Sequence, residues 1–353
     1  CIRDSHDAGR DRKPSSAKDG LFTYFYMMDS KTGNHKKMQS CKHQEPCLYP
    51  LDFDLDNRHV FAVGQAVLAD GTLDPDWEYT DTNALWLYDS ETGKVVEKVF
   101  HDKKYDFSNP RQGYSDGYVL IDRVNKKLLG LSYYADKRKY VYYDQGYANL
   151  RESVKATFPE KIVSIVPNSE FTKVIINTSS EKDPGTGYFY DVSKGKIEFI
   201  ASYAPWLQDY DLGSTYPFEF TARDGVELMG YLTLPPGYKK GDKIPFILHP
   251  HGGPNAKDRF GFNPEVQIYA TRGYGVLQIN YRGSVGFGLK EMKLANKQWS
   301  LAMHDDLLDG LFWANDQGYV NMDKVCISGA SYGGYSAMVL SLIHISEPTR
   351  QKP

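Results

Sequence analysis

Hydrophobic and polar residues follow two different patterns along the chain. From Gly20 to about Tyr210, short runs rich in tyrosine and β-branched residues alternate with turn-forming residues, and helical spacing is scarce. This pattern predicts β-strands that are joined by turns. After about Tyr216, strand-like apolar runs alternate with a helix-like segment, which predicts an α/β sheet. We therefore expect a β-rich domain over residues 1–210 and an α/β domain over residues 211–339.

An aspartate-containing unit recurs in the β-rich part. Each full copy has an aromatic strand-like run, an aspartate, a glycine and a second strand-like run. The aspartate can accept hydrogen bonds from backbone groups in the turn, and the glycine can adopt a positive φ. The spacing of 47 to 60 residues predicts part of a β-propeller built of four-stranded blades, with an irregular β-sandwich as the alternative. The copies lie at residues 24–33, 85–94 and 188–196, with a fainter one at residues 140–144, and their aspartates are Asp29, Asp89, Asp191 and Asp144.

The α/β part contains one helical stripe and several strand-like runs. Leu307, Leu308, Leu311 and Phe312 recur at helical spacing, which predicts a helix over residues 302–315 with these side chains on one apolar face. Helices and strands that alternate in this way predict a doubly wound sheet. The apolar runs predict a hairpin within residues 216–234 and strands at residues 244–248, 275–279 and 324–328.

Composition narrows the class of protein. The 353 residues are 41% hydrophobic, which allows two domains with a core each, and the net charge of −3 gives no case for binding nucleic acid or an anionic membrane surface. No apolar run approaches the roughly 18 residues of a membrane span, and no signal peptide is visible, which leaves the location open.

The four cysteines are too few for a disulfide scaffold. Cys326 lies in a strand-like run and is expected to be a small core residue. Cys41 and Cys47 flank His43, but no second pair of ligands follows at zinc spacing, so we expect no metal and no other cofactor. A disulfide between Cys41 and Cys47 is left open.

The most informative chemical signal is the sequence GASYGG at residues 329–334. Its G-x-S-x-G spacing is that of a nucleophile elbow, in which a serine occupies a strained turn between a strand and a helix. The strand-like residues 324–328 precede it, and a helix can begin near Tyr335. Ser331 is therefore the candidate nucleophile.

A second turn complements the elbow. The sequence HGGP at residues 251–254 follows the strand-like residues 244–248. Hydrolases of the α/β fold take one oxyanion-hole N–H from such a turn and the other from the residue after the nucleophile. Gly253 and Tyr332 are therefore the expected pair, and their N–H groups would stabilise the charge that develops on a substrate carbonyl oxygen.

Three motifs resemble those of the prolyl oligopeptidase family of serine peptidases, most of all its acylaminoacyl-peptidase and dipeptidyl-peptidase branch. They are HGGP at residues 251–254, NYRGSVGFG at residues 280–288 and GASYGGY at residues 329–335, in the family's order and with an acidic helix between the last two. The resemblance implies a partial β-propeller followed by the N-terminal half of an α/β-hydrolase domain, and hydrolysis of short peptides through Ser331. An esterase with the same elbow and a noncatalytic propeller that binds a protein are the alternatives.

The ends of the chain affect what is expected of the site. The sequence begins at Cys1, and residues 340–353 resemble a translated sequencing adapter more than a helix, since Pro348 interrupts the apolar spacing. We expect this tail to be non-native, so His344 is not a catalytic candidate. In this fold the acid and the histidine follow the serine. We therefore expect both to be missing, and a protein of these 353 residues alone to be inactive.

The histidines and acids before Ser331 are expected to have structural roles. Chain order argues against His249, His251 and His304 as the base. His251 belongs to the HGGP turn and is expected to orient it. Asp305 and Asp306 fall in the first turn of the predicted helix, where the helix dipole favours carboxylates.

Overall fold

A computed structural model describes residues 2–5, 22–42, 45–110 and 116–342 of the chain. The chain forms two compact units. The domain boundary expected at residues 210 and 211 stays a prediction. The first unit contains Cys1–Ala135, Lys139–Val141 and Val285–Lys293, and the second contains Asp136–Arg138, Tyr142–Ser284 and Leu294–Pro353.

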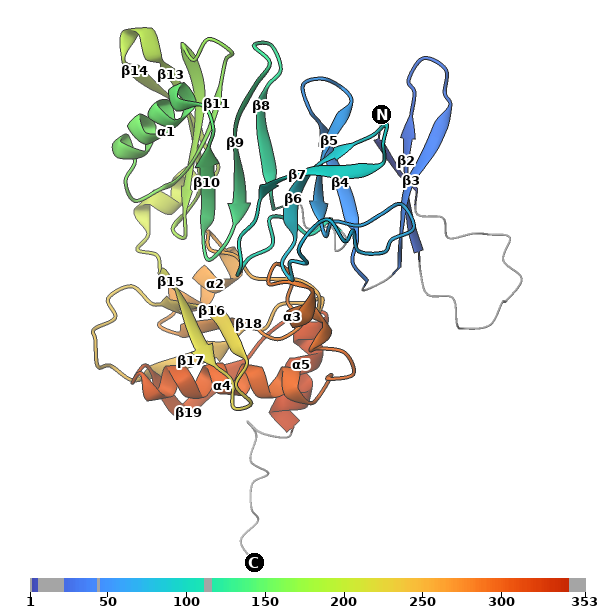
Figure 1. The fold of residues 1–353 in the computed structure, drawn as a ribbon. Coiled ribbons are helices and arrows are strands. Elements are labelled where there is room, and N and C mark those ends of the chain that lie inside the picture. The colour runs from blue at the N-terminus through green and yellow to red at the C-terminus, as the bar shows by residue number, and fades with distance from the viewer. Residues whose placement is uncertain (1, 6–21, 43–44, 111–115, 343–353) are drawn as a thin grey trace, which may run out of the picture. The chain divides into compact units, whose positions relative to one another are not determined.

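The first unit is built from antiparallel strands that pair with their neighbours in sequence (Figure 1). Trp86 is fully buried in one of its core clusters, where its Nε1 donates to the Gly64 carbonyl at 2.9 Å and its ring contacts Trp77 edge to face. The strands are β1 (Ile2–Ser5), β2 (Phe22–Met28), β3 (His35–Lys42), β4 (Leu48–Phe53), β5 (His59–Gly64), β6 (Ala84–Asp89), β7 (Lys94–Phe100), β8 (Tyr118–Asp122), β9 (Lys127–Tyr134) and β10 (Arg138–Tyr142), in the sheets β1-β2-β3, β4-β5-β6-β7 and β10-β9-β8.

Two of the predicted aspartate turns lie in this unit and are confirmed. Asp29 lies in the turn that joins β2 to β3. Its carboxylate accepts hydrogen bonds from the backbone N–H groups of Lys31 and Thr32. Asp89 makes the same contacts between β6 and β7. Gly33 and Gly93 adopt φ of 72° and 76°, as the turn requires. A further turn of this kind, at Asp122 between β8 and β9, was not foreseen because it contains no glycine.

The second unit contains the four-stranded sheet β11-β12-β13-β14. Asp191 joins its last two strands through the third confirmed turn, with Gly195 at φ 62°. The prediction that a return strand follows Asp144 is wrong. Asp144 instead caps the start of a helix, where its side chain accepts a hydrogen bond from the Tyr147 N–H at 2.8 Å. The elements are α1 (Gln145–Thr157), β11 (Ile162–Pro167), β12 (Lys173–Ser180), β13 (Asp183–Asp191), β14 (Lys196–Ser202) and the short 3-10 helices η2 (Val192–Lys194) and η3 (Pro205–Asp209).

The predicted α/β sheet is present in the second unit, with strand order β15-β16-β18-β17-β19. The hairpin β15–β16 is antiparallel, whereas β17 is parallel to both β18 and β19. The bounds are β15 (Ser214–Thr221), β16 (Glu227–Leu234), β17 (Ile244–Leu248), α2 (Pro264–Ala270), β18 (Gly275–Asn280), α4 (Ala302–Asp316), β19 (Val320–Ile327) and α5 (Tyr332–Leu340), and α3 (Leu289–Lys293) belongs to the first unit.

Side chains of the sheet alternate between two layers, as the doubly wound prediction requires. Ile247 and Val276 pack with Val266 of α2, whereas Leu248 and Leu277 lie in the larger core that also contains residues of α4. Helices therefore cover both faces of the central strands. No helix within the described ranges is both long and apolar enough to cross a membrane.

Two predictions of burial are wrong. Phe312 is 45% exposed, because Leu307, Leu311 and the residues one turn away from them form the buried stripe of α4 and Phe312 lies beside it. Cys326 is exposed. Its register partner Ile247 faces α2. Cys326, however, lies on the edge strand β19, and α2 packs on β16 and β18. Cys326 is therefore not covered by α2.

The predictions for the C-terminal tail and for the first cysteines fall partly outside the described residues. Leu340, where the non-native tail was expected to begin, is fully buried in the larger core, and residues 343–353, including His344, lie outside the described residues. His43 and the side chain of Cys41 also lie outside them. Cys47 is disulfide-bonded.

Candidate active site

Ser331 occupies the turn between β19 and α5, as the motif predicts. Its backbone adopts φ 56° and ψ −121°, a left-handed conformation that is rare for a residue with a side chain. Such strain persists only where the surrounding structure enforces it, and it is concentrated at functional sites. Ser331 is exposed.

The glycines around Ser331 are required by close backbone contacts. A Cβ atom on Gly333 would lie 2.1 Å from the Pro250 carbonyl oxygen, and one on Gly329 would lie 2.7 Å from the Gly333 carbonyl carbon. Both distances are far below van der Waals contact. The two glycines therefore let the first turn of α5 pack directly against the end of the preceding strand and the start of the HGGP turn.

The HGGP turn meets the elbow. A Cβ atom on Gly252 would lie 3.3 Å from the Cβ atom and 3.9 Å from the Oγ atom of Ser331. The next residue, Gly253, has φ 126°. The two segments that the sequence predicts to form one site are thus adjacent, although 79 positions separate Gly252 from Ser331.

Tyr332 is the first residue of α5. Its N–H is one of the first four of the helix, which have no acceptor within the helix, and the helix dipole favours negative charge at this end. The side chain is buried against Trp299 and Tyr335, and this burial raises the pKa of Tyr332 to about 12. That the backbone N–H of Tyr332 serves as an oxyanion donor stays a prediction.

The three candidate histidines contact groups other than Ser331. His249 Nδ1 donates to the Ser328 carbonyl at 2.9 Å. His304 Nε2 lies 3.1 Å from the Ser336 hydroxyl inside the protein. His251 contacts the Gly252 carbonyl through Nδ1 and the Ser284 hydroxyl through Nε2. These contacts agree with the structural roles expected for all three.

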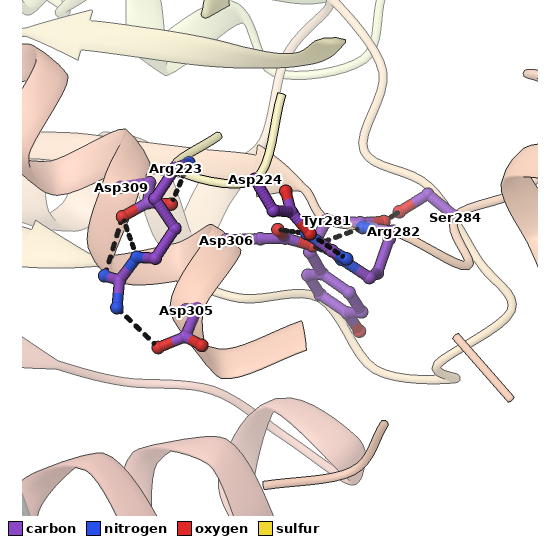
Figure 2. Close-up of polar contacts among 8 residues, drawn as sticks. All are labelled: Arg223, Asp224, Tyr281, Arg282, Ser284, Asp305, Asp306 and Asp309. Carbon is purple, nitrogen blue, oxygen red and sulfur yellow. Dashed lines mark hydrogen bonds and ion pairs between the residues drawn. The ribbon is translucent and has the colours of Figure 1, made fainter. Parts of the chain in front are cut away.

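The acids of α4 form ion pairs with two arginines (Figure 2). Arg282 is buried and donates through its side chain to both oxygens of the buried Asp306 and to both oxygens of Asp224. These contacts, with Asp306 first, raise the pKa of Arg282 further above its ordinary value. The neighbouring Arg223 pairs with Asp305 and Asp309. Asp305 and Asp306 thus hold the β15–β16 turn and the NYRGS loop, defined as residues 280–284, against α4.

Asp258 is a half-buried residue that the sequence did not single out. It follows the HGGP turn, and its Oδ1 accepts from Gln278 Nε2 at 2.8 Å. Its Oδ2 is buried and has no hydrogen-bond partner within the described part of the chain. Burial raises the pKa of Asp258 to about 7. Nothing in its local sequence distinguishes it from the many exposed aspartates.

We expect Asp258→Asn to make unfolding less dependent on pH. The folded-state pKa lies above the unfolded value, so the contribution of Asp258 to stability is complete below about pH 4 and is lost as the pH rises to about 7. An amide does not ionise, so the stability difference between the variant and the unmodified chain should grow by up to about 1.4 kcal/mol per pH unit across this window. Urea denaturation at several pH values measures it, with the exposed Asp316→Asn as the control. A difference that stays constant with pH would refute the assignment.

Comparison with known proteins identifies the family of this chain. Residues 260–344 match the sequence model of the prolyl oligopeptidase family. Dipeptidyl aminopeptidase BIII of Pseudoxanthomonas mexicana is 34% identical over 266 residues, which are 73% of this chain and 37% of that protein. Dipeptidyl peptidase family member 6 of Caenorhabditis elegans is 30% identical over 272 residues, 71% of this chain and 37% of that protein. The chain thus spans less than half the length of these relatives.

Solved structures show the same fold. A puromycin-hydrolyzing peptidase of Mycobacterium tuberculosis matches 90% of this chain and 46% of its own with a TM-score of 0.65 at 16% identity. A puromycin hydrolase matches the same shares with a TM-score of 0.63 at 15% identity. The fold they share with this chain is a β-rich region followed by an α/β region.

Proposed function

Because the chain belongs to the prolyl oligopeptidase family, we propose that the natural full-length protein is a serine peptidase that acts through an acyl-enzyme at Ser331. The observation that carries the proposal is the positive φ of Ser331 in a strand-to-helix turn that packs against Gly252 of the HGGP turn. Backbone strain at such a turn supports a functional role for this serine.

The proposed chemistry follows the arrangement of the turn. Ser331 Oγ adds to the carbonyl carbon of a peptide bond while its proton passes to a general base, and the base then gives the proton to the leaving amine as the carbon–nitrogen bond breaks. Water hydrolyses the resulting ester and restores the serine. Gly253 and Tyr332 would supply the N–H groups that stabilise the tetrahedral oxyanion. The resemblance assigns the base to a histidine after Ser331, and the inactivity of the 353 residues alone stays a prediction.

Short peptides are the proposed substrates. The relatives are named as dipeptidyl aminopeptidases and dipeptidyl peptidases, and we extend cleavage of short peptides to this protein. We also propose that the β-rich region is part of a β-propeller. Two of its sheets, β4–β7 and β11–β14, are four-stranded and connect each strand to the next, as propeller blades do. In such a protein the propeller would limit access to small substrates.

Substrate choice distinguishes this proposal from an esterase with the same elbow. We expect the natural full-length protein to hydrolyse amide bonds in peptides of a few residues and to leave folded proteins intact. The measurement is kcat/KM for a broad library of short peptides, compared with p-nitrophenyl esters of simple acids. Efficient ester hydrolysis without cleavage of any peptide in the library would contradict the peptidase assignment and favour the esterase.

A further inference from the structure

Gln267 of α2 is a buried glutamine whose amide binds two other segments of the second unit. Its Oε1 accepts from the Gly213 N–H at 2.8 Å, and its Nε2 donates to the Gly213 carbonyl at 3.0 Å and to the Glu181 carbonyl at 2.9 Å. Gly213 lies in the linker of residues 210–213 between η3 and β15, and Glu181 lies in the turn between β12 and β13. One side chain therefore connects the sheet β11–β14, the linker and a helix that packs on the α/β sheet.

The burial of Gln267 makes these hydrogen bonds costly to break. The residue is 5% exposed. A side-chain amide has two N–H donors and one carbonyl acceptor, and burying any of them without a partner costs free energy. Gln267 and Gly213 exchange two hydrogen bonds, which is the pattern of a hydrogen-bonded pair in an antiparallel sheet. Separating the three segments would leave buried polar groups unpaired on each of them, so the contact resists separation.

The linker is also fixed by close packing at Gly213. A Cβ atom on this residue would lie 2.7 Å from the Cβ atom of Ala270 and 2.8 Å from the Leu234 carbonyl oxygen. Ala270 is the last residue of α2, and Leu234 is the last residue of β16. Both distances are below van der Waals contact, so the absence of a side chain lets the linker lie against the helix and the strand. The linker thus has little room to move beside Gln267.

A cavity near this contact separates other parts of the same two sheets. Its volume is about 780 Å³. Tyr188 of β13 and Phe199 of β14 line it from one sheet, and Tyr216 of β15 and Leu234 of β16 line it from the other. Where the cavity lies, side chains of the two sheets do not fill the space between them. The hydrogen bonds of Gln267 therefore contribute more to the attachment of the sheets than they would across a fully packed interface.

We propose that Gln267 is a positioning residue that holds the sheet β11–β14 on the α/β sheet and thereby limits the length of the peptides that the protein cleaves. The inference rests on the proposed function, in which the β-rich region restricts access to Ser331. With the Gln267 contact closed, only substrates that fit past the fixed sheets reach the serine. With the contact open, the sheets can separate about the linker and admit longer peptides. Gln267 touches no substrate in this role, so the chemical step does not depend on it.

Gln267→Met tests this role in the natural full-length protein. Methionine has a similar length and shape but no N–H donor and only a weak acceptor, so it removes the three hydrogen bonds without leaving a large cavity. The measurement is kcat/KM for a short peptide and for an unstructured peptide several times longer. We expect the variant to raise kcat/KM for the long peptide by about fivefold or more and to change that for the short peptide by less than about twofold.

The comparison of two lengths separates positioning from a loss of stability. A variant that is only destabilised has less folded enzyme, which lowers the rates for both peptides by the same factor. Gln317→Met is the matched control, because Gln317 is an exposed glutamine at the end of α4. It should leave both rates unchanged. A folded Gln267→Met variant without a selective gain for the long peptide would overturn the positioning role.

Hydrogen exchange keeps the test decisive if Gln267→Met does not fold, because it uses the unmodified full-length protein. The Gly213 N–H donates to Gln267, so a closed contact protects it from exchange. We expect this N–H to exchange at least about 100-fold more slowly than in a free peptide, as buried hydrogen-bonded amides do. Weaker protection would show that the contact is open in solution and would overturn the proposal.

Failure of the proposed function has a different signature. If Ser331→Ala still cleaves short peptides, the peptidase mechanism is wrong. If that variant is inactive while a folded Gln267→Met keeps the length preference of the unmodified protein, only the role of Gln267 is wrong.

Discussion

Replacing Ser331 with alanine should lower kcat for short peptides by at least about 10⁴-fold in the natural full-length protein. Loss of the nucleophile removes the acyl-enzyme route and leaves only the residual catalysis of binding and the oxyanion hole. The backbone of the variant retains the same strained φ, so its fold should remain unchanged. Steady-state hydrolysis of a good peptide substrate measures the loss, and circular dichroism confirms that the variant is folded.

Ser336→Ala is the matched control for this experiment. Ser336 lies on α5 and its hydroxyl is 3.1 Å from His304 Nε2, so the two form a serine–histidine pair within hydrogen-bond distance. Both side chains are buried, which removes them from contact with substrate. We expect this variant to keep activity within a few-fold. A larger loss of activity for Ser336→Ala than for Ser331→Ala would indicate that Ser331 is not the nucleophile.

Replacing Asp306 with alanine should destabilise the chain by about 3 kcal/mol. The substitution leaves the buried Arg282 without its main partner, and removing one member of a buried ion pair costs about 3–5 kcal/mol. Asp224 still binds Arg282, so the lower end of this range applies. The Arg282 backbone N–H also loses its acceptor, Asp306 Oδ2 at 2.9 Å. Urea denaturation of the chain measures the loss.

Asp305→Ala is the neighbouring control. Asp305 pairs with Arg223, but 41% of its side chain is exposed, against none of the Asp306 side chain. Exposed ion pairs contribute at most about 1 kcal/mol. The two substitutions therefore remove chemically identical carboxylates from adjacent positions of one helix. Equal destabilisation by both would show that the Arg282 cluster does not hold the NYRGS loop as described.

Local sequence rules were sufficient where a contact depends on residues close in the chain. The turns at Asp29, Asp89 and Asp191 were predicted because the aspartate and the glycine of each turn satisfy the backbone within a few residues. The strand at residues 244–248 was predicted with its observed ends. The elbow and the HGGP turn were recognised because close backbone packing requires glycine at fixed positions of each motif.

Other features depend on contacts that no local pattern encodes. Asp144 belongs to the same kind of aromatic run as the other turn aspartates, yet it caps α1, whose burial against the rest of the second unit decides the outcome. Phe312 has helical spacing, but it lies beside the buried stripe of α4 and is 45% exposed. The partner of Arg282 lies 24 residues away in sequence, and Asp258, in the loop before α2, is contacted by Gln278 on β18.

Covalent labelling with a fluorophosphonate tests the central claim most directly, because this reagent modifies a serine hydroxyl that the enzyme has activated as a nucleophile. The natural full-length protein is labelled in its native state and again after heat denaturation, and mass spectrometry of its peptides locates the adduct. The account predicts one rapid adduct, on Ser331, in the native protein and none after denaturation. An adduct on another serine in a protein that cleaves peptides, with Ser331 unmodified, would contradict it.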